Sequence, residues 1–386
     1  MTPINSLKFY EGKLRRIKEN IKVFFPGLII SFFTFLFLFL CLELGLRVLK
    51  IQSDNFIKQD PVLGWVHMPD KEGYSISKEF KVKRRVNKDG FIGPDYNYDK
   101  DSDTYRVVIA GDSLTEAFQI KESDTFAALA ERSVNNLDLD KKVEIMNMGI
   151  AGVGTKKEIY ILENNGLKFD PDLLILAFFA GNDFYDNMTE NINPEAKFTR
   201  WREFKNNIKL FFRNHSTAWR FILRQKSRNK LLNFLKKEKN LTTNLGGTPL
   251  LGATYIGNTN ADPLFQEVYS DDVRKMIDMT QKLLLEFKKL AEREKKNHLV
   301  LILPSAAQVY LNGNDGFYPE RINEVLKKYF ESESIKYIDL LPDLKNQYKM
   351  RPEELLYFPI DGHPNENFHR IVAEKLADYL NELVTK

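Results

Sequence analysis

YRVVIAGDSLTE, residues Tyr105–Glu116, is the stretch of sequence that decides the fold. Its first six residues are mostly apolar and β-branched, a pattern typical of a short strand that is buried on both faces. The strand pattern ends at Gly111, and a glycine turn at a strand end lets the next side chain project into a crevice. Ser113 at this place can act as a nucleophile if a base takes its proton. A serine that caps a helix N-terminus would have the same local sequence.

Four further segments share the buried-strand pattern, at residues 143–147, 173–178, 298–303 and 335–339. Helical patterns alternate with them, at 125–135, 156–164, 271–295, 319–331 and 365–383. This alternation predicts a flavodoxin-like, doubly wound parallel sheet of five strands with helices on both faces. Ligands of such sheets bind at the carboxyl ends of the strands, so the residues that follow each strand are candidates for chemistry.

Two of these strand ends carry further candidates. The second strand is followed by Gly149, Gly152 and Gly154, which would let the backbone pass close to a ligand, or simply form a tight turn. The third is followed by Gly181-Asn182-Asp183, and an Asn amide there could donate to a developing oxyanion. Such a donor contributes on the order of 3 kcal/mol to transition-state stabilisation.

The last candidates precede the final helix, in Phe358-Pro359-Ile360-Asp361-Gly362-His363-Pro364-Asn365. A loop histidine with a neighbouring acid suits a general base whose tautomer is fixed by the acid. His363 is one of five histidines, and a lone histidine is more typical of a structural role. His369 falls on the following helix, where we expect packing or a surface position.

Together, the Gly-Asp-Ser-Leu segment, the glycine turn, Gly-Asn-Asp and the Asp/His loop resemble the four sequence blocks of the SGNH, or GDSL-type, hydrolases, in the right order over about 105–384. The resemblance implies the SGNH hydrolase fold and a serine esterase that needs no metal or organic cofactor. It implies that Ser113 is the nucleophile, His363 the general base and Asp361 the acid that orients it. It also implies an oxyanion hole formed by the N–H groups of Ser113 and Gly152 and the side chain of Asn182.

One departure from the family pattern concerns the acid. The spacing Asp361-Gly362-His363 is one residue shorter than the family's usual Asp-x-x-His. Asp361 could therefore orient His363, or the enzyme could work as a Ser–His pair or use another carboxylate. The segments Leu63-Gly64-Trp65 and Asn87–Phe91 also resemble the stretch that precedes the domain in membrane-anchored bacterial members.

Residues 23–42 form an uncharged run that reads VFFPGLIISFFTFLFLFLCL. About 20 such residues span the ~30 Å hydrocarbon core of a bilayer. The run is longer than the apolar region of a signal peptide and is not followed by a small-residue cleavage site, which predicts a retained signal anchor. Six Lys/Arg residues in the tail 1–22 predict a cytoplasmic N-terminus and a periplasmic or extracellular catalytic domain. We expect a β-rich linker at 51–104 and the hydrolase domain at 105–386.

Residues 184–265 interrupt the α/β alternation and predict a basic helical insertion. Residues 197–239 hold 14 Lys/Arg and two acidic residues, with aromatic side chains interleaved. The segment could be a helical lid with solvated charges, or a surface that binds anionic lipid headgroups or an acidic polysaccharide.

The composition excludes several classes of function. The 57 basic and 53 acidic residues give a net charge of only +4, which does not favour nucleic-acid binding. One cysteine, Cys41, excludes an intramolecular disulfide and a Cys/His zinc cluster. The resemblance to the SGNH hydrolases implies hydrolysis of acyl esters, with O-acetyl groups on a cell-surface polysaccharide as the favoured substrate. The same triad would serve an O-acyltransferase that acts on an extracytoplasmic glycan, and a non-catalytic surface-binding domain is the third alternative.

Overall fold

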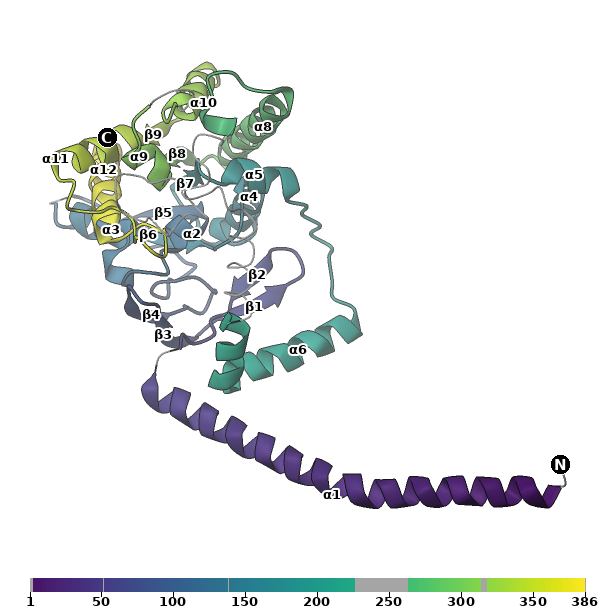
Figure 1. Ribbon diagram of the computed structural model, residues 1–386. Helices are drawn as coiled ribbons and strands as arrows, with labels where there is room; N and C mark the ends of the chain where they lie inside the picture. Colours follow the sequence, from purple (N-terminus) through teal and green to yellow (C-terminus); the bar gives the residue numbers. More distant parts are fainter. Residues whose placement is uncertain (1–2, 51, 138, 226–262, 314–317, 386) are drawn as a thin grey trace. The chain divides into compact units, whose positions relative to one another are not determined.

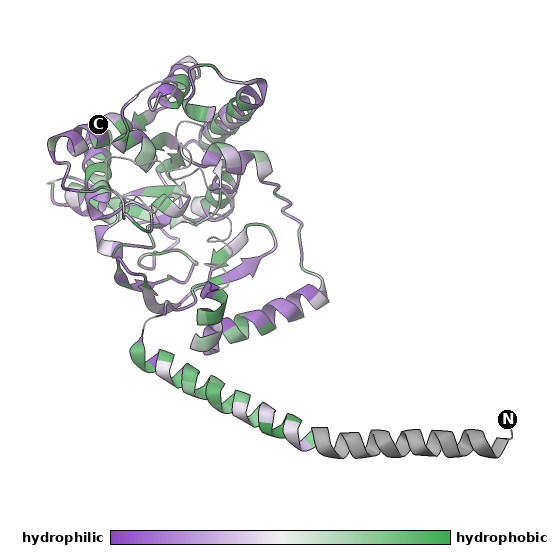
Figure 2. Cartoon of the chain, viewed as in Figure 1, coloured by the Kyte–Doolittle hydropathy of each residue, from purple (hydrophilic) through white to green (hydrophobic). Residues whose placement is uncertain are grey.

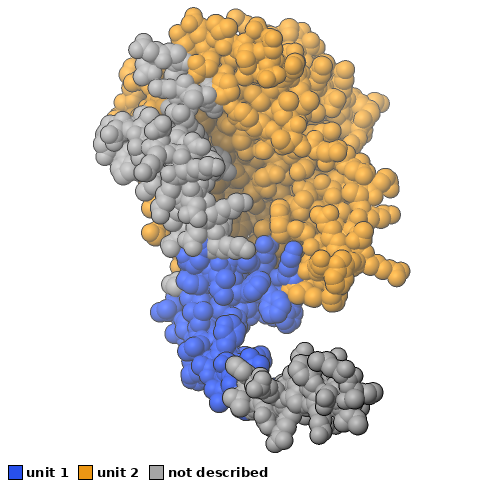
Figure 3. Space-filling view, turned by 45° about the vertical axis from the view of Figure 1, so that its right-hand side comes forward, with its two compact units in different colours: residues 1–52, 209–233 blue, residues 53–208, 234–386 orange. Residues whose placement is uncertain are grey.

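The structure is a computed structural model that describes residues 3–50, 52–137, 139–225, 263–313 and 318–385. The chain divides into two compact units, drawn in blue and orange in Figure 3. The smaller unit comprises residues 1–52 and 209–233, and the larger comprises 53–208 and 234–386. The part of the predicted insertion at 226–262 lies outside the described residues.

The larger unit is built on a five-stranded parallel sheet (Figure 1). Its strands are β5 (Thr104–Gly111), β6 (Lys142–Gly149), β7 (Leu173–Phe179), β8 (Asn297–Leu303) and β9 (Tyr337–Asp339), in the order β6-β5-β7-β8-β9. This is the flavodoxin-like order: the second strand lies on one side of the first strand, and the third, fourth and fifth strands lie on its other side. The predicted fold class is confirmed, and each predicted strand overlaps an observed one.

Alternate residues of the strands build two separate cores. Val108 and Ala110 of β5 face one core, and Val107 and Ile109 face the other. Because both faces are apolar, β5 reads as a continuous apolar run rather than an alternating one. The first core takes side chains from α4 (Thr155–Asn164), α5 (Asp183–Thr189), α8 (Asp271–Arg293) and α10 (Arg321–Ser332), and the second from α3 (Phe126–Asn135), α9 (Ala306–Tyr310), α11 (Leu341–Met350) and α12 (Glu366–Val384). The result is a three-layer sandwich of helices, sheet and helices.

The larger unit also contains shorter elements. The helix α2 is a single turn, Ser113–Glu116, and 3₁₀ turns occur at Glu122–Asp124, Gly166–Phe169 and Pro263–Phe265. Two antiparallel hairpins precede the sheet. They are β1–β2, at Ile57–Asp60 and Gly64–His67, and β3–β4, at Glu72–Ile76 and Lys81–Arg85.

The smaller unit contains the long helix α1 (Pro3–Leu49). Its segment Phe25–Leu49 has a mean hydropathy of 2.4 and is long and apolar enough to cross a membrane. Figure 2 shows this half of α1 as predominantly hydrophobic. The segment lies near the N-terminus, where a signal sequence has the same character. The helix α6 (Arg200–His215) runs from residues of the larger unit into residues of the smaller one.

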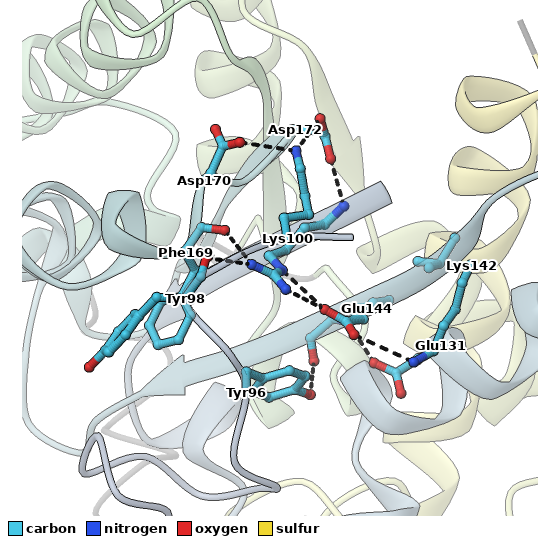
Figure 4. Close-up of polar contacts among 12 residues, drawn as sticks. Tyr96, Tyr98, Lys100, Glu131, Lys142, Glu144, Phe169, Asp170 and Asp172 are labelled. Carbon is cyan, nitrogen blue, oxygen red and sulfur yellow. Dashed lines mark hydrogen bonds and ion pairs between the residues drawn. The ribbon is translucent and has the colours of Figure 1, made fainter. Parts of the chain in front are cut away.

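A network of hydrogen bonds and ion pairs around Arg106 stabilises the amino-terminal ends of the strands (Figure 4). Arg106 of β5 is only 2% exposed, and its guanidinium donates twice to one oxygen of Glu144 at 2.9 and 3.0 Å. It also donates to the backbone oxygens of Tyr98 and Phe169, at 3.2 and 2.7 Å. Because the charge is paired and its donors are satisfied, its burial is tolerated.

We predict that Arg106→Ala lowers the free energy of unfolding by about 3–5 kcal/mol, because it leaves the Glu144 charge without its buried partner. Lys142→Ala is the matched control, since Lys142 contacts the same carboxylate at 3.5 Å but is 65% exposed. It should cost less than about 1 kcal/mol. Urea denaturation of the two variants measures the difference, and equal effects would contradict the account.

Buried carboxyl groups gather near the opposite, carboxyl-terminal edge of the sheet. Asp112, Glu158 and Asp183 are all fully buried. Neither carboxyl oxygen of Glu158 has a hydrogen-bond partner among the described residues. Burial raises the pKa of Glu158 well above its usual range, and the nearby carboxylates of Asp183 and Asp112 raise it further. Glu158 is therefore protonated in the folded state at a pH where the unfolded chain is ionised.

A raised carboxyl pKa means that stability is lost as pH rises above the unfolded value of about 4.3. We therefore predict that Glu158→Gln becomes progressively more stable than the wild type above that pH. The gain is about 1.4 kcal/mol for each unit by which the folded pKa is raised. Denaturation between pH 4 and 8 measures it. Glu163→Gln, a 46%-exposed position on the same helix, should give a difference that varies little with pH. A pH-independent effect of Glu158→Gln would refute the prediction.

Candidate active site

The predicted site residues follow three adjacent strands of the sheet. Ser113 comes two residues after β5, Gly152 three residues after β6, and Asn182 three residues after β7. Since β6, β5 and β7 are neighbours and parallel, their carboxyl ends lie at one edge. This edge is also where the strand order reverses, the usual position of a ligand crevice in such folds.

The turn after β5 presents Ser113 at the start of α2. The Asp112 side chain caps the helix by accepting from the backbone N–H of Leu114 at 2.9 Å. From the neighbouring strand β6, the amide of Asn147 donates to the backbone oxygen of Thr115 at 2.6 Å. Burial raises the pKa of Asp112 to about 7. These contacts hold the short helix, and with it Ser113, against the edge of the sheet.

His363 lies between the last two helices and meets Ser113 across 250 residues of sequence. Its Nε2 is 3.1 Å from Ser113 Oγ, and its Nδ1 is 2.7 Å from Asp361 Oδ1. The shortened spacing is accommodated because Gly362 adopts a φ of +84°, which a residue with a side chain rarely takes. The structure thus brings the three side chains into one hydrogen-bonded row.

The electrostatics of the row fit a proton acceptor. Burial lowers the pKa of His363, but the hydrogen bond and charge of Asp361 outweigh it, so that the pKa is raised above its usual value. The imidazole can therefore take a proton readily, and the resulting cation has a carboxylate at 2.7 Å. The Asp361 side chain is 26% exposed and that of His363 is 14% exposed, so the row borders on solvent.

Gly152 and Asn182 lie on the two flanking turns. Gly152 adopts a φ of +74°. Ser113 is the first residue of α2, so its backbone N–H has no acceptor within that helix. The Asn182 amide donates one N–H to Asp186 at 3.0 Å and retains a second. The two strand ends therefore offer hydrogen-bond donors on both sides of Ser113.

A second histidine–carboxylate pair lies close to Ser113 and was not anticipated from the sequence. His67 Nε2 is 2.5 Å from Glu116 Oε1, and His67 Nδ1 is 3.1 Å from the backbone oxygen of Gly90. Both side chains are buried. His67 lies 49 residues from Glu116, in the segment that precedes the sheet, and no local pattern marks it. His369 is also buried and stacked on Phe126, so that of the two positions expected for it, packing or surface, packing is the one observed.

One family of known proteins matches most of the chain. A sequence model of the family "GDSL-like Lipase/Acylhydrolase" matches residues 107–376. No curated protein matches. Among solved structures, the acetyl xylan esterase AlAXEase is 14% identical, with a TM-score of 0.40 over 71% of this chain and 99% of its own. A member of the lipolytic protein G-D-S-L family from Veillonella parvula is 16% identical, with a TM-score of 0.37 over 71% of this chain and 97% of its own.

These TM-scores are low, so the assignment rests on the family match, which spans the sheet from β5 to most of α12. That match includes the Ser113 turn and the loop that carries His363. The chain therefore belongs to the GDSL-like lipase/acylhydrolase family and is an ester hydrolase.

Proposed function

We propose that the protein is a membrane-anchored serine esterase that uses Ser113 as nucleophile, His363 as general base and Asp361 as the orienting acid. The observation that carries this proposal is the continuous row from Asp361 through His363 to Ser113, at 2.7 and 3.1 Å. These are hydrogen-bonding distances, as nucleophile activation by a neighbouring base requires.

The reaction follows from the positions of the proton donors and acceptors. Ser113 Oγ attacks the ester carbonyl while His363 Nε2 takes the hydroxyl proton. Asp361 stabilises the imidazolium, and the N–H groups of Ser113 and Gly152 with the Asn182 amide bind the oxyanion. The imidazolium then gives its proton to the leaving alcohol, which leaves an acyl group on Ser113. Water, activated by the same imidazole, attacks the acyl-enzyme and releases the acid.

We propose O-acetyl groups on a cell-surface polysaccharide as the substrate. The apolar segment of α1 and the basic tail before it support a catalytic unit held outside the cytoplasm, where such glycans occur. A sugar hydroxyl in place of water in the second step would make the protein an O-acyltransferase. The esterase and the transferase share every step up to the acyl-enzyme. They differ only in whether water or a sugar hydroxyl then accepts the acyl group.

We predict that Ser113→Ala lowers acetate release from p-nitrophenyl acetate and from an acetylated polysaccharide by about a thousandfold or more, since it removes the nucleophile. Ser123→Ala, at a nearby position outside the site, should keep wild-type activity. Release that survives in Ser113→Ala would overturn the mechanism. Labelling of Ser113 by a fluorophosphonate without release to water, but with transfer to a sugar, would identify the transferase. A folded protein without labelling or release would point to a binding domain.

We further propose that α6 lies on an anionic membrane surface. Its exposed side chains include Trp201, Phe204, Phe211 and Phe212, and none of its residues is buried. Basic residues lie between these aromatic residues in the sequence. The Nζ of one of them, Lys205, lies 4.9 Å from the centre of the Trp201 ring. A helix with exposed aromatic and basic residues is typical of the membrane interface. The part of the basic patch at 226–239 lies outside the described residues.

The end of α6 is attached to α1 within the smaller unit, which supports the same proposal. The Glu43 carboxylate accepts from the backbone N–H groups of Thr217 and Ala218 at 3.0 and 2.8 Å and from the Ser216 hydroxyl at 2.9 Å. It thereby caps the helix that begins at Thr217. Arg47 of α1 donates to the backbone oxygen of His215 at 2.5 Å. A carboxylate in an apolar span needs such donors, and here they come from the residues directly after α6.

We predict that the full-length protein in nanodiscs with brominated anionic lipids shows quenching of tryptophan fluorescence, and that Trp201→Phe removes part of it. Trp65→Phe, a substitution in β2, should retain it. Raising the salt concentration should weaken the quenching, because screening shortens the reach of the basic residues. Equal quenching in zwitterionic lipids at all salt concentrations would argue for apolar insertion alone. No Trp201 component would exclude membrane contact by α6.

A further inference from the structure

The turn between β3 and β4 contacts the loop that carries the acid–histidine pair. Glu79, in this turn, accepts from the backbone N–H of Ile360 at 2.9 Å with one carboxylate oxygen. Its other oxygen accepts from the backbone N–H of Asp361 at 2.6 Å. A carboxylate that accepts two N–H groups makes bonds roughly twice as strong as those between neutral groups. The contact joins positions more than 280 residues apart and ends on the backbone of Asp361 itself.

The loop conformation explains why these two N–H groups need an external acceptor. Phe358 donates to the backbone oxygen of His363 at 2.8 Å and accepts from the N–H of Gly362 at 2.8 Å. These bonds close the loop on itself but leave the N–H groups of Ile360 and Asp361 directed to Glu79. Glu79 therefore completes the hydrogen bonding of a loop whose shortened spacing and glycine at 362 give little rigidity of their own.

The turn that carries Glu79 is itself held in place. Ser77 Oγ accepts from the backbone N–H groups of Glu79 and Phe80 at 3.0 and 3.2 Å, and the Ser77 N–H donates to the backbone oxygen of Phe80 at 2.9 Å. The ring of Phe80 lies 5.5 Å from the ring of Phe358, at the start of the same loop. The carboxylate is thus presented by a closed turn rather than by a free side chain.

The same hairpin also contacts the nucleophile's helix. Arg84 of β4 is 1% exposed and donates to the backbone oxygens of Ala117 and Ile120. These oxygens directly follow α2, the single turn that begins with Ser113. The β3–β4 hairpin lies outside the region 107–376 that matches the family. It therefore contacts both the residues that follow α2 and the loop that carries Asp361 and His363.

We propose that Glu79 is a positioning residue that sets the place of Asp361, and through it the orientation of His363 toward Ser113. The inference rests on the proposed function, since it assumes that Asp361 and His363 act in the reaction. Replacing the carboxylate by the amide of Gln leaves a single acceptor oxygen, so that at least one of the two backbone N–H groups loses its bond, the loop can shift and the 2.7 Å contact between Asp361 and His363 weakens. A displacement of about 1 Å at a catalytic group can cost on the order of a hundredfold in rate.

The test compares Glu79→Gln with Glu72→Gln in the full-length protein. Glu72 lies on β3 of the same hairpin, is 52% exposed, and contacts Lys83 and Arg85. We expect Glu79→Gln to lower kcat by about tenfold to a hundredfold with little change in KM. The fall of kcat/KM in acid should move to lower pH, because Asp361 is what raises the pKa of His363. Glu72→Gln should behave as the wild type in both respects.

Asp361→Asn separates positioning from a general loss of stability. In that background Glu79→Gln should cost no more than about twofold further, since the group it positions is gone. Glu79→Asp, which keeps the charge on a shorter side chain, should give an intermediate rate if Glu79→Gln does not fold. Full additivity with Asp361→Asn, or wild-type kcat and pH profile in Glu79→Gln, would overturn the inference while Ser113-dependent activity persists. Activity that does not depend on Ser113 would instead refute the proposed function.

Discussion

The contact between His363 Nε2 and Ser113 Oγ is the interaction on which the rest of the proposed chemistry depends. It joins residues 250 positions apart, at a distance of 3.1 Å that must be kept within a few tenths of an ångström. The sheet holds Ser113, because β5 is buried on both faces and α2 starts two residues after it. The loop before α12 is closed by two backbone hydrogen bonds of Phe358 but is not part of the sheet, so what packs against that loop also contributes to the precision of the contact.

The segment before the sheet supplies that support from two sides. Glu79 binds the backbone of the loop, whereas Arg84 and His67 bind α2 or the residues directly after it. A family domain that lacked this segment would leave the buried Glu116 without the histidine at 2.5 Å, and an unpaired buried charge is costly. The segment thus lies in the same compact unit as the sheet, and its proposed role is to support the catalytic residues.

The strands and most helices could be predicted from the sequence because each has a periodic pattern of its own. α11 (Leu341–Met350) was missed, since only Leu341 and Leu344 are buried and its polar residues hide the pattern. Candidate site residues were found where chemistry coincides with a strand end or a loop histidine, as at Ser113 and His363. Glu79 and His67 could not be found in this way. Their partners are backbone N–H groups and a glutamate far along the chain, and such pairings depend on tertiary structure alone.

An enzyme held at a membrane, as we propose for this protein, works under a constraint that a diffusing enzyme does not have. Tethering confines it with its substrate, so that an effective concentration replaces part of the binding energy that a free enzyme would need. The Glu43 carboxylate joins α1 to the residues directly after α6, and it also pairs with Arg47 of its own helix at 2.5 Å. Glu43 and the residues directly after α6 thus form one hydrogen-bonded group within the smaller unit, as expected if α1 and α6 contact the same membrane, as proposed above.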